Sequence, residues 1–469
     1  MRNKEFTPNT LKLDITKTKL TSAAGLGTLI EAFDVSPLSE EFKKALPDRN
    51  SNRSQGSYRL GLIQLASFIR GHDCIDDLIE FRHDETLFEI MQGETVVPRT
   101  MGDFLRDFED GHLNAINIFL SHQAMSYRKN LDQHLKKPFK PGIAPHLSID
   151  STAHIQNAKK MEGLAYNYKN EWCLDSQVIF DELGLCWDLE LRPGNTKSGV
   201  GAADQIKRAF KDFKFTDEKY LSGDAAYCCQ EIIVTCVGLG IKFTLTANQA
   251  TTGWENHISE INNWQPWIYT EEQLQFAKDR DIVLPEIEVG RFHWSPSWNS
   301  SLKFPVVVKR TAQEQTDLFS GAWKYYGVVT NLDLTTKTYQ EVIEFHAKRG
   351  NAENFIREEK YGYDLKHFPC LKLKANHAFG QIAMCAHNLL RWAAIHDQPH
   401  RPKFAKKMRR QFINIPAKMV SHGRSITLKM SEYYFKEVNR LREALGLKLY
   451  VAKEKVMNSI LSNSPIPTG

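Results

Sequence analysis

Three acidic residues, Asp150, Asp224 and Glu353, have the type and surroundings that metal-dependent chemistry requires. Asp150 ends the short apolar segment HLSID, and Asp224 follows a second segment that begins at Tyr220. If these two strands are neighbours in one sheet and the helix that carries Glu353 packs beside them, the three carboxylates converge. Converging carboxylates repel one another unless divalent cations lie between them. Two Mg²⁺ ions about 4 Å apart would activate a water or a 3′-hydroxyl for in-line attack on a phosphodiester.

The segment around Glu353 is expected to be one long helix, residues 338 to 361, which begins with the capping-box pair Thr338 and Glu341. Four of its residues lie at offsets of 0, 3, 7 and 14, so they fall within roughly 60° of one another on a helix. These residues are His346, Arg349, Glu353 and Lys360. Arg349 and Lys360 would bind DNA phosphates beside the metals. The alternative is a solvated ladder of charges, which is the usual meaning of such a stripe.

Residues 1 to 135 are predicted to form short helices, because apolar residues recur at helical spacings and glycines interrupt them. One of these helices follows the segment VVPR, with Thr100 as its expected N-cap and Asp103 three residues later. A preceding helix, a turn and this helix, which carries Arg99 and Arg106, have the outline of a DNA-reading helix-turn-helix. Ordinary helical hairpins share that outline.

The pattern becomes strand-like from His146 onward, where the sheet is expected to begin. A hairpin is predicted about the turn of residues 181 to 184, and helices and strands then alternate up to residue 246. Three meandering strands followed by strand and helix alternation is the order expected of a ribonuclease H-like α/β core.

This order breaks near residue 250, and the following segment contains six of the nine tryptophans of the chain. It is expected to be a β-rich insertion, in which some of the indoles form the core and others are free to stack on a ligand. The chain is therefore predicted to consist of five parts: a helical N-terminal DNA-binding region (1–135), the core's first part (136–249), the insertion (250–325), the core's second part (326–395) and a basic helical C-terminal region (396–469).

Positive charge is concentrated near the C-terminus of the chain. Residues 366 to 455 contain 19 Lys or Arg and 5 Asp or Glu, an excess of +14, whereas the whole chain has a net charge of +5. Such an excess indicates a polyanion partner, because Lys and Arg that neutralise phosphates release counterions. The alternative is a solvated helical face. The best candidates for phosphate contacts lie in the segment RPKFAKKMRR and are Lys406, Lys407, Arg409 and Arg410.

Several classes of protein are disfavoured by composition and motifs. Hydrophobic residues at 42% and charged residues at 25% describe an ordinary globular chain, and neither a membrane span nor a signal peptide is expected. The expected location is therefore the cytoplasm. The eight cysteines form no Cys-x-x-Cys pair, which disfavours structural zinc and disulfides. The loop GNTKSGVG lacks the ending of a P-loop, so no nucleotide cofactor is expected. Asp73, Asp76 and Asp77 are expected to begin a helix rather than to bind a metal.

The motifs resemble those of a known family. The segment HAKRGNAENFIREEKYG resembles the Tyr-x2-Arg-x3-Glu-x6-Lys signature of bacterial insertion-sequence DDE transposases, and SIDST and SGDAAY resemble the two aspartate motifs of that family. The resemblance is greatest to the branch called transposase DDE domain group 1. Further similar segments are LRPGN, VVTNL, HNLLRW and INIPAKMVSHGR, so the resemblance covers about residues 60 to 435.

This resemblance implies a ribonuclease H-like core with a β-rich insertion and cut-and-paste transposition at the ends of a DNA element. It implies that Asp150, Asp224 and Glu353 bind two Mg²⁺ ions, for which Mn²⁺ substitutes. The expected partners are the terminal inverted repeats and the target DNA, bound by a homodimer in the bacterial nucleoid. The flanking strand would be released through a hairpin intermediate, with a tryptophan of residues 254 to 323 stacked on a flipped base.

One position departs from the family pattern. The tyrosine of the signature is His346 here, so a phenol contact to a DNA phosphate would be replaced by a hydrogen bond from imidazole. The alternative for His346 is an exposed helix histidine with no contact to DNA. Two rival functions also stay open: a domesticated DNA-binding or regulatory protein without cleavage activity, and a standalone nuclease of the same fold.

Overall fold

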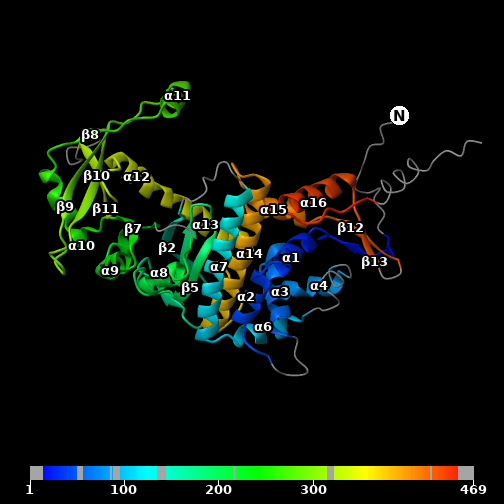
Figure 1. The fold of residues 1–469 in the computed structure, drawn as a ribbon. Coiled ribbons are helices and arrows are strands. Elements are labelled where there is room, and N and C mark those ends of the chain that lie inside the picture. Colours follow the sequence, from blue (N-terminus) through cyan, green and yellow to red (C-terminus); the bar gives the residue numbers. More distant parts are fainter. Residues whose placement is uncertain are drawn as a thin grey trace, which may run out of the picture.

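A computed structural model describes residues 14–49, 56–84, 87, 96–134, 144–214, 218–313, 322–422 and 425–452. Figure 1 shows three parts along the molecule: a sheet with flanking helices, a central pair of long helices, and a helical part that ends in a small sheet. The chain is therefore a mixed α/β structure. No helix among the described residues is long and apolar enough to cross a membrane.

The described residues before position 135 are mostly helical, as expected. The short strand β1 (Leu20–Thr21) precedes them and pairs with a strand near the C-terminus of the chain. The helical elements are α1 (Leu26–Asp34), α2 (Leu38–Ala45), α3 (Ser57–Arg70), η2 (Ile75–Ile79), α4 (Glu80–His83), α6 (Pro98–Arg106) and α7 (Asp110–His134). Their apolar faces join one core with the central helices, because residues such as Phe33, Phe42 and Phe104 are fully buried.

The expected N-cap of α6 was wrong by three residues. Val97 is the N-cap and Pro98 occupies the first helical turn, where its fixed φ suits the helix and its missing N–H costs nothing. Asp103 pairs with Arg106.

A ten-stranded sheet contains the strands that the aspartate motifs follow. Its central strands β2 (His146–Ile155), β6 (Lys219–Gly223) and β7 (Ile241–Thr246) are parallel, and every other pairing is antiparallel. The hairpin of β4 (Trp172–Asp181) and β5 (Cys186–Pro193), together with β3 (Ala165–Tyr166), extends one side of β2. On the sheet's connections lie α8 (Ala202–Phe210), η3 (Ala225–Tyr227) and α9 (Gln230–Gly238).

The segment expected as a separate insertion continues this same sheet instead of building its own. The strand β11 (Trp323–Thr330) pairs with β7, and beyond it lie β10 (Phe304–Ala312), β9 (Ile287–Trp294) and β8 (Gln265–Pro266). Backbone pairing with β11 covers the edge of β7 that would otherwise be exposed. The same segment contains three short helices, α10 (Gln249–Thr252), η4 (Trp254–Glu260) and α11 (Glu271–Asp279), of which α11 projects away from the body (Figure 1).

The long helix expected at residues 338 to 361 is interrupted. It consists of α12 (Tyr339–Ala347), the 3₁₀ turn η5 (Lys348–Gly350) and α13 (Asn351–Gly362). The predicted capping box of Thr338 and Glu341 is confirmed. The interruption ends at Gly350, the residue of lowest helix propensity in this segment. Arg349 consequently lies in the turn, between His346 on α12 and Glu353 on α13.

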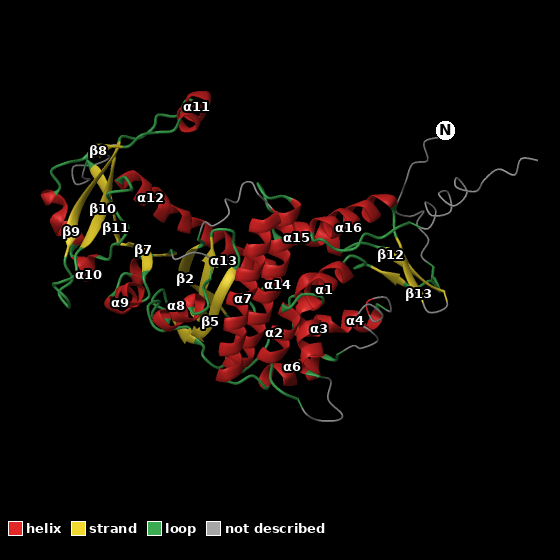
Figure 2. Ribbon diagram, in the orientation of Figure 1, coloured by secondary structure: helices red, strands yellow, loops and turns green. Residues whose placement is uncertain are grey.

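The C-terminal part is less helical than expected. The buried helix α14 (Leu373–Asp397) runs beside α7 in the centre of the molecule (Figure 1). It is followed by α15 (Ala405–Met408), the π-helical turn η6 (Arg409–Ile413), the strands β12 (Ala417–His422) and β13 (Ser425–Lys429), and α16 (Glu432–Ala444). The strands β1, β12 and β13 form a separate three-stranded sheet, seen at the far end of the molecule in Figure 2.

Candidate active site

Asp150 lies on the parallel part of the sheet, directly beyond the last residue pair of β2 and β6. Ile149 of β2 is in register with Gly223 of β6, so the next position on each segment is Asp150 and Asp224. One carboxylate oxygen of Asp150 accepts the Ser151 N–H at 2.8 Å, and the other lies 3.7 Å from a guanidinium nitrogen of Arg349. The two aspartates are therefore neighbours, as the sequence predicted, although Asp150 lies in the middle of β2, which continues to Ile155, and not at the end of the strand.

The position of Asp224 is fixed by a cap and by an amide bridge. Its carboxylate accepts the Ala226 N–H at 2.8 Å and thereby caps the 3₁₀ turn η3. The side chain of Asn248, at the end of β7, donates to the carbonyl of Ala225 at 2.9 Å. Asn248 therefore ties the loop that follows Asp224 to the adjacent strand.

Glu353 completes the acidic group from the first turn of α13. The pKa of Asp150 is raised to about 6, chiefly by burial and also by the negative charges of Asp224 and Glu353, against the opposing effects of the Ser151 N–H and Arg349. The other two predicted carboxylates therefore both act on Asp150. Their donor atoms are all carboxylate oxygens, which suit Mg²⁺ or Mn²⁺, and a divalent cation would relieve the repulsion.

The ligand atoms of Asp150, Asp224 and Glu353 do not all lie within 4.8 Å of one another. Among the described residues, the side chains of Asp73, Cys74 and Asp77 form a group that meets this distance. The carboxylate of Asp77 accepts the backbone N–H groups of Asp73 and Cys74 at 3.0 and 3.3 Å and caps η2. The prediction that these acids begin a helix is confirmed, and their closeness follows from that cap.

The two bases of the stripe lie on either side of Glu353 and contact β2. Arg349 approaches Asp150, as described above. The ammonium group of Lys360 donates to the carbonyl of Ala153 at 2.7 Å, and burial lowers the pKa of Lys360. In this conformation Lys360 joins α13 to β2, the strand that carries Asp150.

His346 is buried, which excludes the alternative of an exposed helix histidine. Its side chain is 1% exposed, and both ring nitrogens have protein partners. Nδ1 lies 3.0 Å from the hydroxyl of Thr244, while Nε2 lies 2.9 Å from the hydroxyl of Tyr326 and 3.0 Å from that of Thr246. A hydrogen bond from this imidazole to a DNA phosphate would require these partners to be exchanged.

A row of hydroxyl groups beneath α12 could not be recognised as part of the site from the sequence. Ser148, Ser222, Thr244 and Thr330 occupy paired positions on β2, β6, β7 and β11, and all four are buried. The available signal was the serine two residues before each aspartate, in SID and SGD. Tyr227 is also buried nearby, and the side-chain amide of Gln177 donates to its hydroxyl at 3.0 Å.

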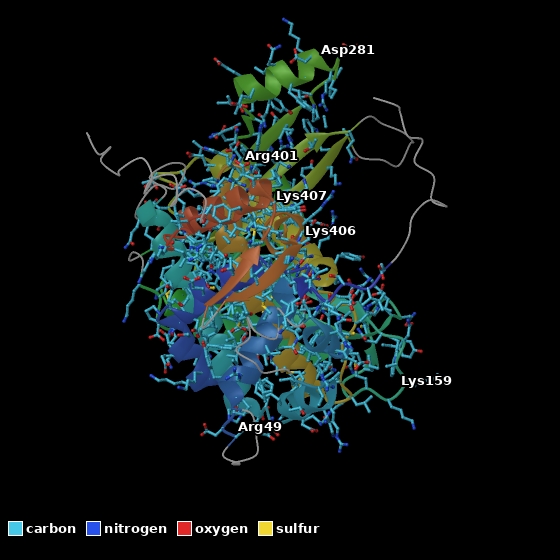
Figure 3. The ribbon with its side chains drawn as sticks, turned by 90° about the vertical axis from the view of Figure 1, so that its right-hand side faces the viewer. Arg49, Lys159, Asp281, Arg401, Lys406 and Lys407 are labelled. Atoms are coloured by element: carbon cyan, nitrogen blue, oxygen red, sulfur yellow. The ribbon has the colours of Figure 1, made fainter. Side chains whose placement is uncertain are left out.

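The basic C-terminal segment divides into exposed and buried residues. Lys406, Lys407 and Arg410 are exposed, and Figure 3 shows Lys406 and Lys407 near Arg401 on the face that carries the C-terminal elements. Arg409 is 8% exposed instead. Its guanidinium donates to three backbone carbonyls, at 2.8, 3.2 and 2.6 Å; these belong to Phe68, Ile69 and Gly362. Arg409 thus joins the N-terminal helices to α13.

Comparison with known families agrees with this geometry. The family model described as transposase DDE domain group 1 matches residues 5–446. The chain belongs to this family. No curated protein matches its sequence. Transposases of the DDE family use divalent metal ions and bind DNA.

Proposed function

We propose that this DDE transposase carries out metal-dependent cut-and-paste transposition of an insertion sequence. The observation that carries this proposal is the register of β2 and β6, which makes Asp150 and Asp224 neighbours, with the charge of Glu353 acting on Asp150. The strand order β5-β4-β2-β6-β7, with its three parallel central strands, supports a ribonuclease H-like core. The added strands β8 to β11 take the place of the insertion.

Each residue of the site has a separate task in this proposal. Asp150, Asp224 and Glu353 would hold two Mg²⁺ ions, and Mn²⁺ would substitute. When bound, such ions activate the attacking oxygen and stabilise the leaving oxygen in an in-line displacement. Arg349 balances the charge of Asp150 and is placed to bind a DNA phosphate beside it. Lys360 keeps α13 against β2.

The proposed hairpin step needs an aromatic ring that a flipped base can reach. Trp254 and Trp294 are 6% exposed and belong to the core. The Arg310 guanidinium lies over the rings of both Trp264 and Trp323, 4.1 and 4.4 Å from their centroids. A base can stack on one of the partly exposed rings of this segment by replacing such a contact, since stacking contributes about 1–3 kcal/mol per base.

DNA binding by the C-terminal segment gives a prediction for a double variant. Replacing Lys406 and Lys407 with Ala should weaken binding to every DNA sequence and flatten its salt dependence by about two charge contacts, because both side chains are exposed. The measurement is the dissociation constant from 50 to 300 mM salt. A matched control is the pair Lys43 and Lys44 on α2, also exposed, whose replacement should leave the slope unchanged. An unchanged slope for the Lys406 and Lys407 variant would place the contacts elsewhere.

The transposase is expected to act as a homodimer, because the two ends of the element must be held together during cutting. The mass of the complex with DNA that carries one terminal inverted repeat, measured by light scattering, should correspond to two protomers. A complex whose mass contains a single protomer would contradict this expectation.

The test of the proposed function is cleavage of labelled DNA that carries the sequences flanking this gene. With Mg²⁺, the purified protein should nick the ends, form hairpin products and join the ends to target DNA, and EDTA should stop all three. Cleavage without joining would indicate a nuclease. Binding without cleavage would disprove the catalytic proposal and favour a domesticated DNA-binding protein.

A further inference from the structure

A continuous chain of hydrogen bonds crosses the sheet beneath α12. The imidazole Nε2 of His146 on β2 lies 2.6 Å from the Ser222 hydroxyl on β6. That hydroxyl lies 2.6 Å from the hydroxyl of Thr244 on β7, which in turn lies 3.0 Å from Nδ1 of His346 on α12. The ring then reaches Tyr326 on β11 through Nε2, at 2.9 Å. Five elements, β2, β6, β7, α12 and β11, are thus linked by polar side chains.

The surroundings of His346 determine which of its nitrogens carries the proton. Nδ1 lies 3.2 Å from the backbone carbonyl of Thr244, which can only accept a hydrogen bond. Nδ1 therefore donates, and Nε2 accepts from the hydroxyl of Tyr326 or Thr246. Burial lowers the pKa of His346 to about 3 and that of His146 to about 4, so both rings are neutral at physiological pH. The hydrogen bonds of the chain therefore join neutral groups.

Each proposed metal ligand has a member of this chain on its own segment. The pairs are His146 and Asp150 on β2, Ser222 and Asp224 at the end of β6, and His346 and Glu353 on the two sides of η5. The backbone ladder already fixes β2 against β6. No such ladder holds α12, whose Val342 shares an apolar cluster with Val307 and Val328 of the sheet and whose Gln340 bonds the backbone of Ile268 near the start of the helix. Apolar contact is not directional, whereas a hydrogen bond to Thr244 fixes the position of α12 along the sheet.

We infer that His346 and Thr244 are positioning residues, which hold α12 and η5 on the sheet so that Arg349 and Glu353 meet the two aspartates at the correct spacing. This inference rests on the proposed function, since it concerns the same metal site. Mg²⁺ demands near-ideal octahedral geometry, so a small displacement of Glu353 weakens its binding. Supporting residues of this kind change metal affinity by about 10–100-fold when they are replaced.

The test uses a pair of matched variants. Thr244→Val removes the Thr244 hydroxyl from the hydrogen-bond chain and keeps the shape of the side chain. Thr330→Val removes a hydroxyl that lies in the same row and is equally buried. The partners of that hydroxyl, the carbonyl of Phe243 and the N–H of Leu332, do not belong to the hydrogen-bond chain. Both proteins should lose similar thermal stability. Only Thr244→Val should raise the dissociation constant for Mn²⁺, measured by electron paramagnetic resonance, by about tenfold.

Substitutions of His346 complete the test. His346→Leu should weaken Mn²⁺ binding and raise the Mg²⁺ concentration needed for cleavage by at least the same factor. His346→Asn should restore most of the affinity, because its amide N–H can donate to the carbonyl of Thr244. The control His377→Leu removes another buried histidine, which bonds the carbonyl of Leu189 at 2.9 Å, and should change only stability.

The inference would be overturned if Thr244→Val and Thr330→Val had the same dissociation constant for Mn²⁺, whether or not that constant differed from the wild-type value. If the wild-type protein neither binds Mn²⁺ nor cleaves DNA, the proposed function itself fails. Amide hydrogen exchange then tests separately whether Thr244 and His346 hold α12 and η5 on the sheet. Faster exchange across residues 339–350 in Thr244→Val than in Thr330→Val would support it, and identical exchange would overturn it.

Discussion

Glu353→Gln is expected to abolish DNA cleavage, with a loss of at least about 10³-fold, while DNA affinity stays within about threefold. The amide has the size of the carboxylate but no charge, so the site would lose one of its three anionic ligands. A bound metal stabilises the charge of the transition state by several kcal/mol, and each 1.36 kcal/mol is about a tenfold change in rate. The measurement is cleavage of labelled element ends with Mg²⁺, together with a binding titration of the same DNA.

The matched control for this prediction is Glu344→Gln. Glu344 lies on α12, is exposed, and accepts a hydrogen bond from Gln340 at 2.8 Å. The same chemical change nine residues from Glu353 should leave cleavage intact. Undiminished cleavage by Glu353→Gln would remove Glu353 from the proposed site. Loss of binding along with cleavage would show that Glu353 supports the fold instead of the metal.

The sequence was sufficient to predict where Asp150 and Asp224 lie. Apolar segments with strand periodicity, each carrying an aspartate, give parallel strands that place the two aspartates side by side, and the structure has this register, although β2 continues five residues beyond Asp150. The capping box at Thr338 was predictable as well, because its two residues are three positions apart in the chain. Both features depend on short-range patterns.

The burial of His346 and Arg409 could not be predicted in this way. On a helical stripe with Arg349, His346 has the pattern of an exposed residue, and its hydroxyl partners come from strands 100 and 20 residues away. The carbonyls that bind Arg409 include those of Phe68 and Ile69, some 340 positions earlier. A polar side chain is buried only where distant backbone and hydroxyl groups satisfy it. Periodicity carries no information about such partners.

The extension of the sheet beyond β11 was missed for a related reason. The second part of the core was predicted to begin at residue 326, so most of β11 was already assigned to the core. The tryptophans and irregular spacing between residues 250 and 325 indicated a change of structure, but not its pairing partner. Pairing of β10 with β11 depends on backbone hydrogen bonds that any residues can make, such as those that align Val306 with Val329. The β-rich character was therefore predictable, and the continuity with the central sheet was not.

Asp150→Asn is expected to stabilise the metal-free protein at pH 8 by about 1–3 kcal/mol, although it should abolish cleavage. The folded pKa of Asp150 is raised from 3.8 to about 6, so the fold favours its protonated form. The stability that this preference contributes is complete below about pH 4 and is lost as the pH rises through about 6. Two pKa units correspond to roughly 3 kcal/mol, with the opposing effect of Arg349 already included.

The measurement is the free energy of unfolding by urea in EDTA, compared between the wild type and Asp150→Asn at pH 4, 6 and 8. Other buried aspartates, Asp175, Asp181 and Asp188, also have a pKa near 6, so the wild-type curve alone does not report on Asp150. The difference between the two proteins isolates it. That difference should be near zero at pH 4 and largest at pH 8.

Addition of metal should reverse the order of stability. If the proposed site is correct, Mg²⁺ should bind the folded wild type and stabilise it in proportion to the logarithm of its concentration over the dissociation constant, whereas Asp150→Asn would lack a ligand and should gain little. The repulsion between the carboxylates in the metal-free protein would then be the same feature that makes the site bind cations. If Asp150→Asn were less stable than the wild type in EDTA at pH 8, the Asp150 carboxylate would stabilise the metal-free fold. That result would contradict the prediction that its charge destabilises the fold until a cation binds.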